Sequence, residues 1–179
     1  EVMGRDAGHI AISAGIAGGA DVILIPEIPY TLDNLCQKLF ERQDRGKNYS
    51  LIVVSEAVRT DTGETVTRTN RLGQCRLGGI GDYLADRISA CTGAETRVIV
   101  LGHIQRGGTP SPLDRLVASA FGVAAVDLIA DGKYDHMVGW QNRQVVSVPI
   151  GEAIAQYRAV DPNGTLVKTA RGLGIYLGD

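Results

Sequence analysis

Three short apolar runs, separated by stretches of helical periodicity, constrain this chain more than any other feature. The runs occupy residues 21–26, 49–55 and 95–101 and are rich in Val, Ile and Leu. Short apolar runs are typical of strands covered on both faces, as in a parallel sheet. Between them, residues 31–42 and 78–90 carry apolar positions three and four apart, which indicates helices. This alternation predicts an α/β fold built on a parallel sheet.

The rest of the chain adds further predicted elements, one of which has a well-defined start. Ser111 suits an N-cap and Pro112 the first helical position, so we expect a long apolar helix to Ile129. Asn142 and Arg143 separate two strand patterns and predict a hairpin. The other expectations are a largely buried helix over 8–18, a polar irregular region over 59–73, a short helix over 149–157, and no assigned structure over 161–179.

Composition excludes several classes of partner. The net charge is −2, with 44% apolar and 21% charged residues, which is ordinary for a globular protein. No overall positive field is present to attract nucleic acid or an anionic membrane, so we expect neither as a partner. No apolar run approaches the length of a membrane span and no signal peptide is found, which favours a cytoplasmic protein.

The cysteines and the first residue bear on the origin of the chain. Cys36, Cys75 and Cys91 are odd in number and form no CxxC pair, so free thiols in a reducing cytosol are predicted. The chain begins with Glu1 and not with Met, so we expect it to be part of a longer protein.

The strongest candidate for chemistry is the glycine-rich loop after the third apolar run. Polar groups at the carboxyl end of a buried strand are where open α/β sheets place ligands. Arg97, His103 and Arg106 together supply several donors and two fixed positive charges, which suits a phosphate. The alternative for His103 is a core histidine that donates to a backbone carbonyl; the two neighbouring arginines favour the phosphate. With three histidines and no ligand spacing, a metal site is not predicted.

Two other segments could contribute to an anion or sugar site. Arg5 lies in Met3-Gly4-Arg5, just before the first predicted helix, where a guanidinium and helix N–H groups can point at a phosphate. The alternative is a solvated surface arginine. Glu56 follows the second apolar run and could accept sugar hydroxyls or orient a cation. The alternative is an ordinary surface acid. No P-loop and no GxSxG motif occurs.

Taken together, these motifs resemble the 6-phosphofructokinase family. The signature stretch is Arg97, Gly102-His103, Gln105-Arg106-Gly107-Gly108 and Asp114-Arg115 at the family's spacing, and it is accompanied in the family's order by Met3-Gly4-Arg5, Ile25-Pro26-Glu27 and Val54-Ser55-Glu56. The resemblance runs from residue 1 to about residue 142 and is weaker beyond. It implies a three-layer, parallel-sheet sandwich of the phosphofructokinase type.

The resemblance also implies an activity. Members of the family transfer a phosphoryl group to the 1-hydroxyl of fructose 6-phosphate, a step of glycolysis, with ATP and Mg²⁺. Arg5 would stabilise charge on the transferring group. His103 and Arg106, with Ile104 and Gln105 in the same stretch, would hold the 6-phosphate. The remaining implied roles are backbone contacts to the sugar from Met3 and Gly4, acceptance of sugar hydroxyls by Glu56, and contact of Arg97 with a neighbouring subunit's substrate in a dimer or tetramer.

The resemblance further implies that the chain is the C-terminal half of a two-lobe protein. The family's catalytic aspartate and nucleotide loop lie upstream of Met3. We therefore expect residues 1–108 to form most of the sugar-phosphate lobe, residues 109–150 a return segment of the nucleotide lobe, and residues 151–179 a helix and tail that pack back on the sugar lobe. The isolated chain would be catalytically incomplete, with Mg²⁺ and ATP bound mainly by the other half.

Regulation and the phosphoryl donor are left open by the sequence. Asp21, Arg45 and Lys47 occupy positions that bind a diphosphate effector in allosteric members, although the family more often has Glu at the first. The alternative is three surface charges on loops. Pyrophosphate could replace ATP as donor, since both kinds of enzyme share this half. A third alternative is a non-catalytic, sugar-phosphate-binding or regulatory subunit.

Overall fold

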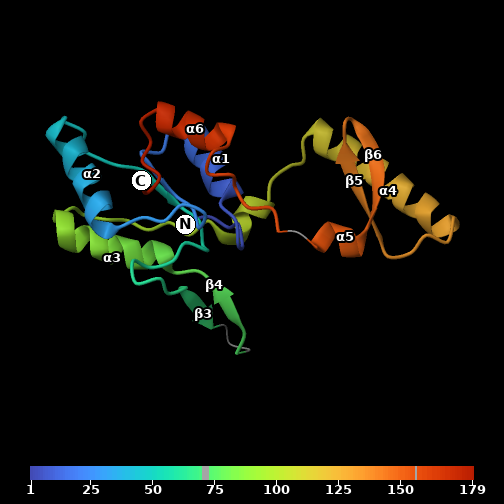
Figure 1. Cartoon of the computed structure of the whole chain (residues 1–179), viewed down its shortest axis with the longest axis horizontal. Helices are drawn as coiled ribbons and strands as arrows, with labels where there is room; N and C mark the ends of the chain where they lie inside the picture. The colour runs from blue at the N-terminus through green and yellow to red at the C-terminus, as the bar shows by residue number, and fades with distance from the viewer. Residues whose placement is uncertain (70–72, 156) are drawn as a thin grey trace. The chain divides into compact units, whose positions relative to one another are not determined.

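The computed structural model describes residues 1–69, 73–155 and 157–179, which divide into two compact units (Figure 1). Unit 1 comprises residues 1–106 and 159–179, and unit 2 comprises residues 107–158. Unit 1 contains all the residues that the sequence identified as site candidates.

Unit 1 is built on a parallel sheet. Strands β1 (Val22–Leu24) and β2 (Ile52–Val54) pair in parallel, with Val22 opposite Ile52. Two short extended segments continue the sheet, one on each side. Val2 forms a parallel bridge with Ser55, and Tyr176 forms one with Val22. The spatial order is therefore residue 176, β1, β2, residues 1–3.

Side chains of β1 alternate between two cores, one on each face of the sheet. Ile23 belongs to the core formed with α1 (His9–Ala17) and α6 (Thr165–Gly172). Val22 and Leu24 belong to the core formed with α2 (Leu32–Asp44) and α3 (Ile80–Thr92). All three side chains are fully buried, and each such burial contributes roughly 2 kcal/mol. The predicted α/β class is confirmed, as a helix–sheet–helix sandwich.

The helices of unit 1 begin where local signals place them. The Thr31 side chain accepts a hydrogen bond from the backbone N–H of Asn34 and so caps α2. α1 and α3 also form where predicted, but α1 is not largely buried: only Ala11, Ile12 and Gly15 are buried, because one face of the helix lies on the sheet and the other faces solvent. α6 and the bridge at Tyr176 give structure to a tail whose structure the sequence left unassigned.

The prediction of a third strand covered on both faces is wrong. Residues 95–101 have no assigned strand; they make two backbone hydrogen bonds to Glu1, from its nitrogen to the Ile99 oxygen (2.8 Å) and from the Leu101 nitrogen to its oxygen (3.1 Å). Ile99 is 71% exposed, so the segment lies at an open edge of the sheet and is not covered on both faces. The apolar run indicated extended backbone but could not show how few partners it has.

A second correction concerns the polar region over 59–73. Part of it forms β3 (Thr67–Thr69), which pairs in antiparallel fashion with β4 (Cys75–Leu77). All three side chains of β3 are exposed. A strand with no buried face has no apolar alternation, which is why the sequence did not reveal it.

The third correction concerns the cysteines. Cys36 of α2 and Cys91 of α3 form a disulfide, whereas Cys75 is free and exposed. The pair is separated by 55 residues, and only the packing of α2 against α3 brings it together. Spacing along the chain carries no sign of such a contact.

Unit 2 consists of α4 (Pro112–Ala130), the antiparallel strands β5 (His136–Gln141) and β6 (Gln144–Pro149), and α5 (Ile150–Ile154). The predicted cap is present: the Ser111 side chain accepts from the Asp114 nitrogen, and Asp114 accepts from the Ser111 nitrogen. The predicted hairpin is also present, with Asn142 and Arg143 both in the left-handed region. In the described part of the chain, no helix is long and apolar enough to cross a membrane.

Candidate functional site

The candidate site lies where the parallel segments of unit 1 end. Because these segments run in one direction, the residues that follow them meet at one edge of the sheet. Three stretches come together there: residues 3–5, Glu56, and the 3₁₀ turn η1 (Gly102–Arg106). Met3 donates its backbone N–H to the Gln105 side-chain oxygen at 2.8 Å. Gly4 and Arg5 donate theirs to Glu56 Oε1 at 3.0 and 2.8 Å.

The backbone of Gly4 and Arg5 is held in a tight turn. A Cβ at Gly4 would lie 2.3 Å from the Ala7 carbonyl oxygen, so no larger residue fits without a backbone shift. Arg5 has a φ of 52°, a left-handed conformation that costs a non-glycine residue about 1 kcal/mol or more. The hydrogen bond to Glu56 holds it there. The Arg5 side chain is 91% exposed, and its ion pair with Asp6 (3.7 Å) is therefore weak.

The two carboxylate oxygens of Glu56 differ in their hydrogen bonding. Oε1 accepts both backbone bonds from residues 4 and 5, and the Glu56 nitrogen donates to the Val2 oxygen at 2.9 Å. Oε2 has no hydrogen-bond partner among the residues that the structure describes. A carboxylate oxygen in this state can accept a hydroxyl group.

The two basic side chains of η1, His103 and Arg106, are exposed to solvent. Gly102 has a φ of 51° and turns the chain out of the extended segment. His103 and Arg106 are exposed, and within the described ranges neither side chain has a hydrogen bond or ion pair. Ile104 is 80% exposed, whereas Gln105 is half-buried against Met3. A guanidinium with five free donors beside an imidazole can bind an anion such as a phosphate.

Arg97 lies outside this cluster. Its guanidinium donates to Glu95 Oε1 at 3.0 and 3.1 Å, and both side chains are largely exposed. An exposed pair of this kind contributes little to stability. Arg97 can therefore exchange Glu95 for another anion at low cost.

Among the residues that the structure describes, no hydrogen bond or ion pair joins the three effector candidates to one another. Asp21 is paired with Arg42 at 2.6 Å and accepts the backbone N–H of Leu51 at 2.8 Å. Arg45 and Lys47 follow the end of α2 and are exposed. The effector site stays a prediction.

Two acidic residues hold backbone N–H groups at helix starts, a role that the sequence did not reveal although Glu27 belongs to the Ile25-Pro26-Glu27 motif. Glu27 accepts the backbone N–H of Gly8, the N-cap of α1, at 3.0 Å and that of Val160 at 2.9 Å. Glu1 accepts the N–H groups of Gly79 and Gly81 at the start of α3. The only available signal was the presence of glycines at both helix starts, where N–H groups need acceptors.

The described residues contain no cluster of metal-ligating side chains. No group of three His, Cys, Asp or Glu side chains lies close enough there to hold a metal ion. Mg²⁺ takes carboxylate and phosphate oxygens, and the donor set here is chiefly cationic. These residues therefore do not fit a bound Mg²⁺ ion.

Comparison with known proteins identifies the family of the chain. The phosphofructokinase family model matches residues 1–129. A Nostoc protein (strain PCC 7120) named ATP-dependent 6-phosphofructokinase 1 is 74% identical over all of this chain and 50% of its own length. A Synechocystis protein (strain PCC 6803) of the same name is 66% identical over the same shares. The chain thus spans about half the length of these relatives.

Solved structures give the same result at the level of fold. A Pichia pastoris phosphofructokinase in the T-state has a TM-score of 0.65 and 28% identity, over 96% of this chain and 18% of that one. A pyrophosphate-dependent phosphofructokinase from Marinobacter aquaeolei has a TM-score of 0.71 and 23% identity, over 99% of this chain and 47% of that one. The family match, the relatives and the fold lead to one conclusion: the chain belongs to the phosphofructokinase family.

Proposed function

We propose that this chain is the sugar-phosphate-binding, C-terminal part of an ATP-dependent 6-phosphofructokinase. The full-length enzyme would transfer the γ-phosphoryl group of ATP to the 1-hydroxyl of fructose 6-phosphate, giving fructose 1,6-bisphosphate. The observation that carries the proposal is the juxtaposition of residues 3–5, Glu56 and η1 at one sheet edge. ATP is favoured over pyrophosphate because the relatives of 74% and 66% identity are named ATP-dependent.

The proposed roles follow from the free groups at that edge. His103 and Arg106 bind the 6-phosphate, with Ile104 and Gln105 in the same turn lining the site. Glu56 uses its free Oε2 to accept a sugar hydroxyl, while its Oε1 holds the turn of residues 4 and 5. Met3 and Gly4 contact the sugar through backbone atoms.

The proposed catalytic residue of this chain is Arg5. Phosphoryl transfer depends on positioning and on stabilising charge that is spread over the equatorial oxygens of the transferred group. The exposed guanidinium of Arg5 is held by a fixed backbone beside Glu56 and can supply that charge. Mg²⁺ accompanies ATP and neutralises phosphate charge, and we assign its binding to the other half of the full-length protein.

The lobes and the assembly belong to the same proposal. Residues 1–108 would form most of the sugar-phosphate lobe, 109–150 the return segment of the nucleotide lobe, and 151–179 the tail that returns to the sugar lobe. Arg97, exposed and weakly paired, would reach the 6-phosphate of a neighbouring subunit's substrate in a homo-oligomer. We place the enzyme in the cytoplasm, without nucleic-acid or membrane partners.

Steady-state kinetics of the full-length enzyme test the proposal. Removing the free cation in Arg106→Ala should raise KM for fructose 6-phosphate about tenfold or more, because a charged hydrogen bond to phosphate is lost. His103→Ala should raise it about severalfold. The matched control is Arg76→Ala, an exposed arginine on β4 outside the cluster, which should leave KM unchanged.

Two outcomes would contradict the proposal. Unchanged KM in both Arg106→Ala and His103→Ala would remove η1 from the site. A full-length protein that binds fructose 6-phosphate calorimetrically but shows no turnover with ATP would favour the binding-only alternative.

A further inference from the structure

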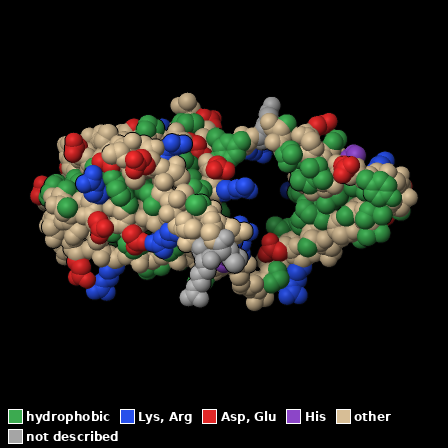
Figure 2. Space-filling view, turned by 90° about the horizontal axis from the view of Figure 1, so that it is seen from below, with side chains coloured by type: hydrophobic (Ala, Val, Ile, Leu, Met, Phe, Trp, Pro, Cys, Tyr) green, Lys and Arg blue, Asp and Glu red, His purple; other side chains and the backbone are tan. Residues whose placement is uncertain are grey.

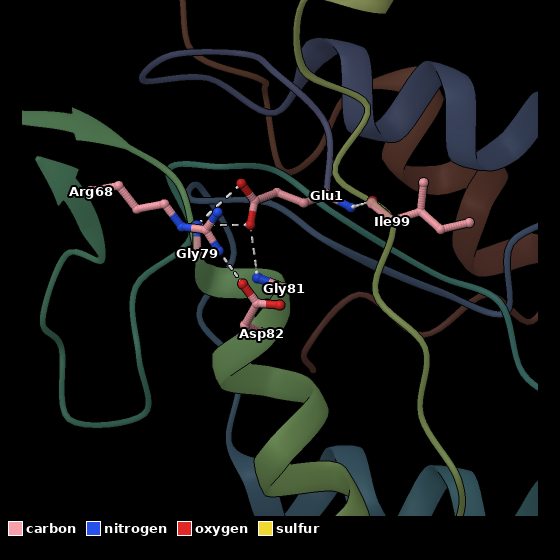
Figure 3. Close-up of polar contacts among 6 residues, drawn as sticks. All are labelled: Glu1, Arg68, Gly79, Gly81, Asp82 and Ile99. Atoms are coloured by element: carbon pink, nitrogen blue, oxygen red, sulfur yellow. Dashed lines mark hydrogen bonds and ion pairs between the residues drawn. The ribbon is translucent and has the colours of Figure 1, made fainter. Parts of the chain in front are cut away.

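Glu1 makes more connections within unit 1 than the sequence suggested. Its carboxylate accepts the backbone N–H of Gly79 (3.0 and 3.2 Å to the two oxygens) and that of Gly81 (2.9 Å to Oε2), as Figure 3 shows. Its own backbone pairs with Ile99 and Leu101 on the extended segment. One residue therefore joins the start of α3 to two of the stretches that end in the candidate site.

The start of α3 is shaped around this carboxylate. Gly78 and Gly79 have φ values of 140° and 104°, which only glycine adopts readily. A Cβ at Gly81 would lie 3.1 Å from Val98 Cγ1 and 3.3 Å from both Cβ and Oε2 of Glu1. A Cβ at Gly78 would lie 3.3 Å from Glu1 Oε1. The glycines thus allow the helix start to close on Glu1 and on the extended segment together.

The electrostatics of this contact are favourable. The first N–H groups of a helix have no partner within the helix and carry its positive dipole end, so a carboxylate there is stabilised. Asp82, also in the first turn of α3, is instead occupied by an ion pair with Arg68 of β3, visible beside Gly79 in Figure 3. The Gly79 and Gly81 bonds are therefore supplied by Glu1 and not by this neighbouring acid.

The two segments that Glu1 joins both lead directly to candidate substrate-binding residues. Met3 is two residues further along the first segment, and η1 begins immediately after Leu101, the end of the second. The Met3–Gln105 hydrogen bond closes the connection between them at 2.8 Å. A shift of Glu1 would change the distance between the turn of residues 3–5 and the side chains of His103 and Arg106.

We propose that Glu1 is a positioning residue for the sugar-phosphate site. By anchoring on the start of α3, it fixes the register between residues 1–5 and residues 99–106. It does not touch substrate. This inference rests on the proposed function, since it deepens the assignment of that site.

The test is kinetic and uses the full-length enzyme. Glu1→Ala should raise KM for fructose 6-phosphate about tenfold, because misplacement of binding groups weakens substrate binding. Glu1→Gln keeps one acceptor oxygen and should raise KM by a smaller factor. KM for ATP should stay within about twofold in both variants if only the sugar side is affected. The matched control is Asp82→Asn, which changes the charge of the same helix turn without touching Glu1 and should leave both constants unchanged.

This pattern separates positioning from a purely structural role. A residue that only stabilises the fold would lower the active fraction, and so apparent kcat, without changing KM. If Glu1→Ala does not fold, Gly81→Ala decides, because its added methyl group presses on Glu1 and Val98 and should also raise KM for fructose 6-phosphate.

The outcomes also separate this inference from the proposed function. If Arg106→Ala raises KM while folded Glu1→Ala, or Gly81→Ala in its place, does not, the positioning role is wrong and the proposed function stands. If the wild-type enzyme shows no turnover of fructose 6-phosphate, the proposed function fails and the inference fails with it.

Discussion

Units 1 and 2 differ sharply in how their apolar side chains are covered. Unit 1 has two cores that contain fully buried residues on both faces of its sheet, such as Ile12, Ile23 and Leu35. In unit 2, none of the residues that the structure describes is buried. Its helix α4 leaves Leu116, Val123, Val126 and Ile129 between 59% and 65% exposed, and hydrophobic side chains are prominent on the surface of this unit in Figure 2.

This difference indicates which part of the chain is structurally self-sufficient. The helices and strands of unit 1 cover one another, whereas α4 offers a wide apolar face to something outside its own unit. Because the chain spans about half the length of its relatives, we expect the remainder of the full-length enzyme to cover α4. Substitutions in each unit test this contrast.

A cavity in the core of unit 1 should have the largest effect. Ile23→Ala removes a fully buried side chain and should lower the free energy of unfolding of the 179-residue chain by about 4 kcal/mol. Urea denaturation followed by circular dichroism measures this. The control is Ile154→Ala in α5, 76% exposed, which should change it by less than about 0.5 kcal/mol. Equal effects of the two substitutions on the free energy of unfolding would contradict the difference in burial between the two units.

Reduction of the Cys36–Cys91 disulfide should destabilise unit 1 by about 3 kcal/mol, because the bond closes a loop of 55 residues in the unfolded chain. Denaturation with and without dithiothreitol measures this. The Cys36→Ser/Cys91→Ser double variant should be insensitive to reductant, and Cys75→Ser should respond like the wild type. A wild-type chain whose stability ignores dithiothreitol would argue that the pair is reduced in solution.

A smaller effect is expected on α4, and it should depend on the length of the protein. Val126→Ala in the 179-residue chain should change stability by less than about 0.5 kcal/mol, because the side chain is already 65% exposed. In the full-length enzyme the same substitution should cost about 2 kcal/mol, since it would remove buried methyl groups. Equal small effects in both proteins would show that α4 stays exposed in the full-length enzyme.

The smallest effect concerns the cap of α4. Hydrogen bonds from the Ser111 side chain and backbone hold the pKa of Asp114 below its usual value. A depressed pKa means that the cap stabilises α4 above the ordinary aspartate range and is lost as pH falls through the depressed value. Titration of the Asp114 carboxyl carbon by NMR should show this, with an Asp114 midpoint in the Ser111→Ala variant closer to normal. An identical midpoint in both proteins would contradict the cap.

Sequence reasoning succeeded where the determining interactions are local. Ser111 caps its helix through a residue three positions away, as predicted, and Thr31 caps α2 in the same way. It failed where distant segments decide: the extended segment around Ile99 lacks neighbours, and Cys36 finds Cys91 only through helix packing. For the candidate site, the position after the second apolar run pointed to Glu56, and the resemblance supplied Gln105. The sequence did not indicate that Glu56 accepts the backbone N–H of Arg5, 51 residues away, or that Gln105 accepts that of Met3, 102 residues away.

The bridge between Tyr176 and Val22 has a consequence for the synthesis of the protein. Unit 1 is a discontinuous domain: its sheet edge and α6 come from residues that the ribosome makes after the whole of unit 2. Glu27 likewise receives the N–H of Val160 only at that late stage. Residues 1–106 therefore remain incompletely covered while about fifty further residues are translated. This takes several seconds at ordinary rates of synthesis. During that interval the core formed with α1 and α6 lacks the residues that complete it, among them Val167 and Leu177.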